Sequence, residues 1–100
     1  MNKYKKKPVV IEAVQFKYAN NTEDLVFSFE GDEMPKWLKL ALDTKVIEPK
    51  VRRESGKVEL WIKTLEGGHW GSWLDWILQG VKGELYPCKP DIFEATYEEA

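Results

Sequence analysis

The apolar and polar positions of residues 57–65 alternate strictly along the chain. One face of this segment is aliphatic, and the opposite face carries Glu59, Trp61 and Lys63. A period of two is typical of a β-strand that buries one face, because successive side chains point to opposite sides. We therefore predict a strand at residues 57–65 whose outward face contains a tryptophan.

A different period governs residues 33–43, where apolar side chains recur every three to four positions. This spacing predicts one main amphipathic helix, since it aligns those side chains along one stripe of the helix surface. Asp32 is suited to cap the first N–H groups, and Pro35 falls in the first turn, where its missing N–H has no cost. We expect the stripe to place Trp37 in the core.

Shorter apolar runs predict the remaining elements. Residues 8–16 are rich in β-branched side chains and predict a strand that begins at Pro8, with Glu12 in a covered position where a carboxylate needs a partner. Paired glycines in the segment 66–68 predict a tight turn into a partner strand at 69–73. Apolar and β-branched runs also predict a short extended or helical piece within 25–29 and a brief strand at 46–47 stopped by Pro49. A strand pair is predicted at 76–79 and 84–86, ended by Pro87, and a short C-terminal helix at 90–98.

Together these elements predict an α+β fold in a single domain, residues 1–100. We expect one twisted antiparallel sheet of about five strands, one main helix at about 33–43 and a short C-terminal helix. With 100 residues, of which 43% are apolar, the chain can bury one modest core. The chain has no run of about 18 apolar residues, so we predict no membrane-spanning helix and no membrane partner.

Charge divides the chain into two unequal parts. Over its whole length, 15 basic and 17 acidic residues give a net charge of −2. Residues 1–7 carry four lysines, which leaves 11 basic and 17 acidic residues, or a net charge of −6, for the remainder. The sequence therefore predicts a basic N-terminal arm on an acidic body. Such an arm can contact nucleic acid, but four lysines without interleaved aromatic residues are more typical of a solvated tail.

The sequence contains no recognisable catalytic or metal-binding constellation. One histidine and one cysteine, His69 and Cys88, are too few nitrogen and sulfur ligands for a tetrahedral zinc site. His69, Ser72 and Asp75 are the residue types of a nucleophilic triad. They lie within seven positions of one predicted hairpin, however, and three residues so close in sequence could hardly arrange a nucleophile, a base and an orienting carboxylate in line. We predict no catalytic residue, no metal and no cofactor, and we expect the protein not to be an enzyme.

With catalytic and metal sites excluded, the tryptophans are the remaining candidates for function. The chain has five tryptophans, four of them between residues 61 and 76. Trp61 faces away from the aliphatic side of its strand, and strand alternation would place Trp73 on the opposite face from Trp70. An outward indole could pack under the final helix, be buried against a second copy in a homo-oligomer, or form a binding patch. The candidate binding residues are Trp61, Trp70 and Trp73, with Arg52 and Lys63 as charged neighbours, and Glu12 as either an ion-pair partner or a ligand contact.

The two ends of the chain carry extended motifs. Residues 4–16 are Tyr-Lys-Lys-Lys-Pro-Val-Val-Ile-Glu-Ala-Val-Gln-Phe, and residues 80–94 are Gly-Val-Lys-Gly-Glu-Leu-Tyr-Pro-Cys-Lys-Pro-Asp-Ile-Phe-Glu. Together with Pro-Lys-Trp-Leu at 35–38, these motifs resemble those of a family of small proteins of tailed bacteriophages and prophages, chiefly of Gram-positive hosts. One position differs, because the family has Pro-Gly before an Asp-aromatic pair and this chain has Trp-Leu at 73–74. The turn geometry of the family is therefore not expected to transfer.

The resemblance implies a phage or prophage accessory protein that acts in the cytoplasm of the bacterial host, with no established activity to transfer. The leading hypothesis is binding of a host protein, in host takeover or anti-defence. A second is a small-molecule or nucleotide binder that sequesters a host signal, and a third is nucleic-acid binding through the basic arm. A concave site lined by Trp61, Trp73 and Arg52 would favour the small ligand, and a flat apolar patch would favour the protein.

Overall fold

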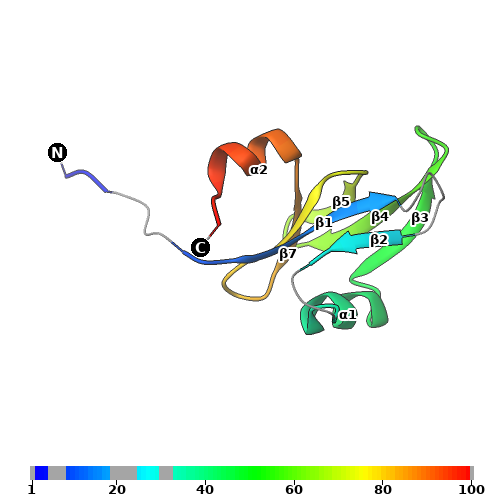
Figure 1. Cartoon of the computed structure of the whole chain (residues 1–100), viewed down its shortest axis with the longest axis horizontal. Helices are drawn as coiled ribbons and strands as arrows, with labels where there is room; N and C mark the ends of the chain where they lie inside the picture. Colours follow the sequence, from blue (N-terminus) through cyan, green and yellow to red (C-terminus); the bar gives the residue numbers. More distant parts are fainter. Residues whose placement is uncertain (1, 5–8, 19–24, 30–32, 100) are drawn as a thin grey trace.

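The computed structural model describes residues 2–4, 9–18, 25–29 and 33–99, which form two antiparallel sheets and two helices (Figure 1). The four-stranded sheet has the order β2-β1-β6-β7, with β1 at Glu12–Tyr18, β2 at Leu25–Ser28, β6 at Trp76–Gln79 and β7 at Leu85–Cys88. The three-stranded sheet has the order β3-β4-β5, with β3 at Ile47–Arg52, β4 at Lys57–Thr64 and β5 at Gly67–Gly71. The helices are α1 at Lys36–Asp43 and α2 at Pro90–Thr96. The α+β class is confirmed, but the strands divide into two sheets where we predicted one of about five strands.

The hydrophobic core lies between the facing sides of the two sheets. Phe16 of β1 and Ile77 of β6 belong to the same buried cluster as Leu60 and Ile62 of β4, and each of these side chains is fully buried. Gly71, the last residue of β5, allows the sheets to approach one another. A Cβ atom there would lie 3.1 Å from a terminal methyl group of Ile62 and 3.1 Å from one of Ile77.

The helix α1 contributes to this core as its apolar stripe predicts. Leu38 and Ala41 are buried, and Trp37 is half-buried and packs against the core cluster. The helix begins later than predicted, because Pro35 is the residue before its first turn and accepts hydrogen bonds from two helical N–H groups through its carbonyl. Asp32, the predicted cap, lies outside the described residues.

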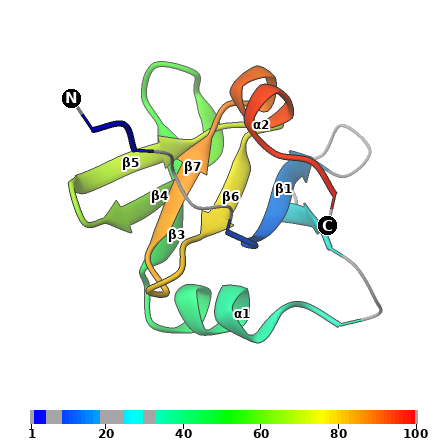
Figure 2. The ribbon, with the colours of Figure 1, turned by 90° about the vertical axis from the view of Figure 1, so that its left-hand side faces the viewer.

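The helix α2 lies on the opposite side of the sheets from α1 (Figures 1 and 2). Its Phe93 stacks on Trp76 of β6, with ring centroids 4.1 Å apart and an interplanar angle of 11°. Leu78, two residues along β6, is fully buried on the same face. The predicted C-terminal helix is therefore present, and the indole that packs under it is Trp76.

Two prolines predicted to end strands lie inside them instead. Pro49 of β3 pairs with Leu60, and Pro87 of β7 pairs with Ile77. Both β3 and β7 are edge strands, so one side of each has no neighbouring strand that requires a proline N–H. The edge position explains why neither proline stops its strand.

Strand boundaries differ from the prediction at two further places. The first strand begins at Glu12, four residues after Pro8, and continues to Tyr18. The strand β5 includes both glycines of the predicted turn, which is confined to residues 65–66. The remaining predicted strand pair and the strand at 57–65 are confirmed within one or two residues.

The chain crosses from the three-stranded sheet to the four-stranded sheet within residues 72–75. The predicted strand at 69–73 ends at Gly71, so Trp73 lies in a turn and the alternation argument does not apply to it. Leu74 has a φ of 71°, in the left-handed region that favours glycine. Leu74 thus adopts a backbone conformation that a residue without a Cβ atom would adopt more readily.

No helix within the described ranges has the length and apolarity needed to cross a membrane. Of the predicted basic arm, residues 1 and 5–7 lie outside the described residues, so most of that prediction is not addressed by the structure.

The close approach of the sheets at Gly71 predicts a stability effect. Gly71→Ala places a methyl group against two buried isoleucine methyl groups and should lower the free energy of unfolding by about 1–3 kcal/mol, as overpacking does. Urea unfolding measures this loss. Glu94→Gln is the control, because Glu94 is exposed on α2 and away from the contact between the sheets. Equal stabilities of the two variants would contradict this account of the sheet packing.

Candidate functional site

Four of the six predicted binding residues, Arg52, Trp61, Lys63 and Trp70, lie on one side of the three-stranded sheet. The strand register places this side opposite to the buried Leu60 and Ile62. It is termed the indole face and consists of Glu48, Lys50, Arg52, Lys57, Glu59, Trp61, Lys63 and Trp70. Of the two described helices, α2 stacks on β6 and α1 packs into the core, and α1 residues share a pocket with Lys63 at one end of this face.

The two indoles of this face form a cross-strand pair. Trp61 and Trp70 are directly opposite in the register of β4 and β5, and their ring centroids are 5.0 Å apart at an interplanar angle of 64°. This edge-to-face arrangement is a favourable one for aromatic rings. Gly68 makes it sterically feasible, because a Cβ atom at that position would overlap the six-membered ring of Trp61. The pair is half-buried and held in a defined orientation.

Arg52 connects the indoles to the charged part of the face. Its guanidinium carbon lies 5.5 Å from the ring centroid of Trp70, within cation–π distance. The same guanidinium forms ion pairs of 3.3 Å with Glu59 and with Glu54. Three contacts on one side chain restrict its rotamers, so Arg52 is oriented before any partner arrives.

Glu59 is the residue of this site that the sequence analysis missed. It is only 4% exposed, and its carboxylate accepts hydrogen bonds from the hydroxyl groups of Ser55 and Ser72 and from Arg52. Burial acts to raise the pKa of Glu59, but the two hydroxyl donors and the Arg52 charge outweigh it and lower the pKa below its ordinary value. Arg52 and Ser55 belong to the same hairpin as Glu59 and could have signalled this contact, whereas Ser72 is distant in sequence.

The structure does not bring Glu12 and Trp73 to this face. Glu12 was predicted to be covered, but it is exposed at the first position of β1, opposite Gln79 in the other sheet. Its strand starts there instead of at Pro8, so the carboxylate lies at the end of the strand pairing and needs no buried partner. Trp73 is 54% exposed in the turn at 72–75.

The residues considered for catalysis make other contacts. The Ser72 hydroxyl group donates to Glu59, and the buried Asp75 accepts from the Ser72 N–H and from Lys89, each at 2.9 Å. Burial raises the pKa of the Cys88 thiol, and Asp75 and Asp91 raise it further. A thiol of this kind is protonated at neutral pH and is a poor nucleophile. Within the described part of the chain, no group of three residues is arranged to hold a metal ion.

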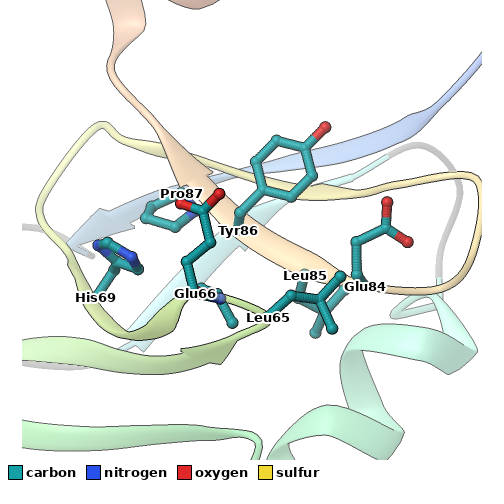
Figure 3. Close-up of a pocket in the computed structure, with 8 residues that line it drawn as sticks. Leu65, Glu66, His69, Glu84, Leu85, Tyr86 and Pro87 are labelled. Atoms are coloured by element: carbon teal, nitrogen blue, oxygen red, sulfur yellow. The ribbon is translucent and has the colours of Figure 1, made fainter.

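Two pockets of the described structure lie away from Trp61 and Trp70. These neighbouring pockets, of about 400 and 270 Å³, are found beside the start of β7, and Figure 3 shows the larger one. Of the predicted binding residues, only Lys63 lines either pocket. Arg52, Trp61 and Trp70 line neither pocket and lie on the surface of the three-stranded sheet.

Comparison of the chain with protein-family models, with curated proteins and with solved structures found no match in any of the three. The resemblance to the phage family is not tested by these comparisons and stays a prediction.

The position of Gly68 under the Trp61 ring predicts a spectroscopic effect. Gly68→Ala should displace that ring and remove most of the circular-dichroism exciton couplet that two close indoles produce. Trp70→Phe provides the reference spectrum, because it deletes one member of the pair. An unchanged couplet in Gly68→Ala would show that the indoles do not pack as described.

The lowered pKa of Glu59 predicts a pH dependence of stability. The folded-state pKa is below the unfolded one, so the stabilisation is present above the unfolded value and disappears as the pH falls through the folded value. Glu59→Gln should lower the free energy of unfolding by about 1–3 kcal/mol at pH 7, with a much smaller difference near pH 3. Urea titrations at both pH values test this, with the exposed Glu94→Gln as control. A pH-independent difference would contradict the assignment.

Proposed function

We propose that this protein is a non-catalytic accessory protein of a phage or prophage that binds a protein of its bacterial host through the indole face. The observation that carries the proposal is the pair of half-buried indoles, Trp61 and Trp70, oriented beside Arg52 on the outer face of the three-stranded sheet. The family resemblance supplies the phage origin and the host cytoplasm as the place of action. The described residues support the mode of action, which is binding.

The composition of the face is suited to a protein interface. Tryptophan and arginine are the residues that most often dominate the binding energy of such interfaces. Here Trp61 packs edge-to-face on Trp70 and Arg52 is paired with Glu59, so both side chains are ordered before binding. Less side-chain entropy is then lost on association, which favours affinity.

Charge indicates the kind of partner surface. The 3.3 Å ion pairs Lys50–Glu48 and Arg52–Glu59 balance both acidic residues of the indole face. The two remaining charged residues, Lys57 and Lys63, are both exposed and positive. The face is thus locally basic on a chain whose net charge is −2, and it complements an acidic rim around an apolar patch.

The other two binding hypotheses have less support. A small molecule or nucleotide needs a concave site, and neither pocket is lined by Arg52, Trp61 or Trp70. The two indoles also meet at 64°, so they do not offer parallel faces between which a base could stack. The arm that would bind nucleic acid lies largely outside the described residues.

Affinity capture from the bacterial host tests the proposal. The tagged protein should retain a specific host protein, and Lys57→Glu should reduce its affinity for the purified partner at least tenfold, because it reverses a charge on the face without touching the core. Lys36→Glu, an equal charge reversal at the start of α1, should bind like the unaltered protein. Trp61→Ala should abolish binding, with circular dichroism confirming that it folds.

Two results would overturn the proposal. One is capture of the same host protein with equal affinity by Lys57→Glu and Trp61→Ala. The other is saturable quenching of tryptophan fluorescence by a nucleotide at micromolar concentration, which would favour the small-ligand hypothesis.

A further inference from the structure

A groove distinct from the indole pair runs beside the start of β7. The two neighbouring pockets share Thr64, Leu65, Glu84 and Leu85, so they adjoin one another, and together they are termed the groove. The larger pocket extends toward His69 and Pro87 (Figure 3), and the smaller one extends to α1. The two pockets offer separate places for two side chains of one bound molecule.

The larger pocket is acidic. None of its lining residues is lysine or arginine, and it carries two carboxylates, Glu66 from the β4–β5 turn and Glu84 from the segment before β7. Figure 3 shows these side chains on either side of Leu65 and Leu85. Glu84 is held in place, because its carboxylate accepts the Lys82 N–H at 2.9 Å. A cation in this pocket would have carboxylates on two sides.

The phenol of Tyr86 does not alter this charge at neutral pH. Burial, together with Tyr97 and Glu84, raises the pKa of Tyr86 to about 12. The side chain is therefore a neutral hydroxyl group on an aromatic ring in the wall of the pocket. Such a ring adds a surface that a cation or an aliphatic stem can contact.

The rims of the groove are apolar and open to water. Leu65, which lines both pockets, is 83% exposed, and Leu40 of α1, which lines the smaller pocket, is 63% exposed. Ala41 and Val46 continue the aliphatic wall of the smaller pocket. Two exposed leucines along one depression favour an occupant with an aliphatic side chain next to its charged one.

We infer that this groove docks an extended segment of a partner protein, with a lysine or arginine in the larger pocket and an aliphatic residue in the smaller one. The opposite charge of the larger pocket selects the basic side chain, whose stem can pack on Leu65 and Leu85 while its charge meets Glu66 and Glu84. In an extended segment, residues two positions apart point to the same side, so a basic-x-aliphatic motif suits two adjoining pockets. The inference does not rest on the proposed function, since the groove shares only Lys63 with the indole face.

Titration with short capped peptides, followed by amide chemical shifts in NMR spectra, tests this inference. The peptide acetyl-Gly-Lys-Gly-Leu-Gly-amide should shift the resonances of residues 64–69 and 84–88 in a saturable manner. Replacing its lysine by glutamate should abolish the shifts, and replacing its leucine by glycine should weaken binding severalfold. Glu66→Gln should weaken binding of the lysine peptide about fivefold, as loss of one exposed ion pair does. Glu94→Gln, on α2, should have no effect.

Three outcomes would overturn the inference. Equal binding of the glutamate peptide would show that the carboxylates do not select the ligand. Equal affinity for n-butylamine would show that the site takes a free amine and not a peptide segment. Shifts confined to Trp61, Trp70 and their neighbours would place the peptide on the indole face. Lys57→Glu alters the indole face and not the groove, so it should bind the lysine peptide like the unaltered protein. The inference and the proposed function can therefore fail separately.

Discussion

The crossing at residues 72–75 is the constraint on which the rest of the structure depends. In four residues the chain leaves β5 of one sheet and enters β6 of the other, and two buried carboxylates hold it. Glu59 accepts the Ser72 hydroxyl group, and Asp75 accepts the Ser72 N–H. Buried carboxylates are costly without such partners, so the crossing is stable only in the conformation that supplies them.

Distant elements are tied to this short segment. The Phe16 N–H donates to the Asp75 carbonyl, and the Leu74 N–H donates back to Phe16, which fixes β1 beside β6. Lys89, immediately before α2, pairs with the Asp75 carboxylate at 2.9 Å. On the other side, Glu59 binds Arg52 and thereby orients the charged edge of the indole face. Sheet pairing, the docking of α2 and the arrangement of the indole face thus share one set of buried polar contacts.

Local pattern was enough to predict the elements whose stability is local. The alternation around Trp61 and the apolar stripe around Leu38 each identify one buried face, and both are observed. Local pattern was not enough at Pro49 and Pro87, because whether a proline can stay in a strand depends on whether that strand lies at an edge. The edge position of β7 follows from the long-range pairing of β1 with the other side of β6, and that of β3 from its having β4 as its one neighbour in the described sheet. Neither arrangement is contained in a short window of sequence.

In the candidate site, too, local pattern predicted some residues, and long-range contacts determined the others. Trp61 and Trp70 were candidates because strand alternation allowed outward indoles. Their direct pairing depends on a two-residue turn at 65–66, whereas the turn was predicted at 66–68. Glu59 was missed because its third partner, Ser72, reaches it from the crossing at 72–75. Glu12 and Trp73 were misplaced for a related reason, since both positions depend on where a strand ends, and strand ends here are set by tertiary contacts.

The division into two sheets also explains why the outer face of the three-stranded sheet carries partly exposed indoles. Over β6, both faces of the four-stranded sheet are occupied, with Ile77 in the core on one side and Trp76 under α2 on the other. The three-stranded sheet has the core on one side only, and no second helix remains among the described elements to cover its outer face. Its aromatic residues must pack on one another, as Trp61 and Trp70 do across Gly68. Such a pair buries part of the apolar surface of each indole and leaves the rest accessible, which is what the proposed binding requires.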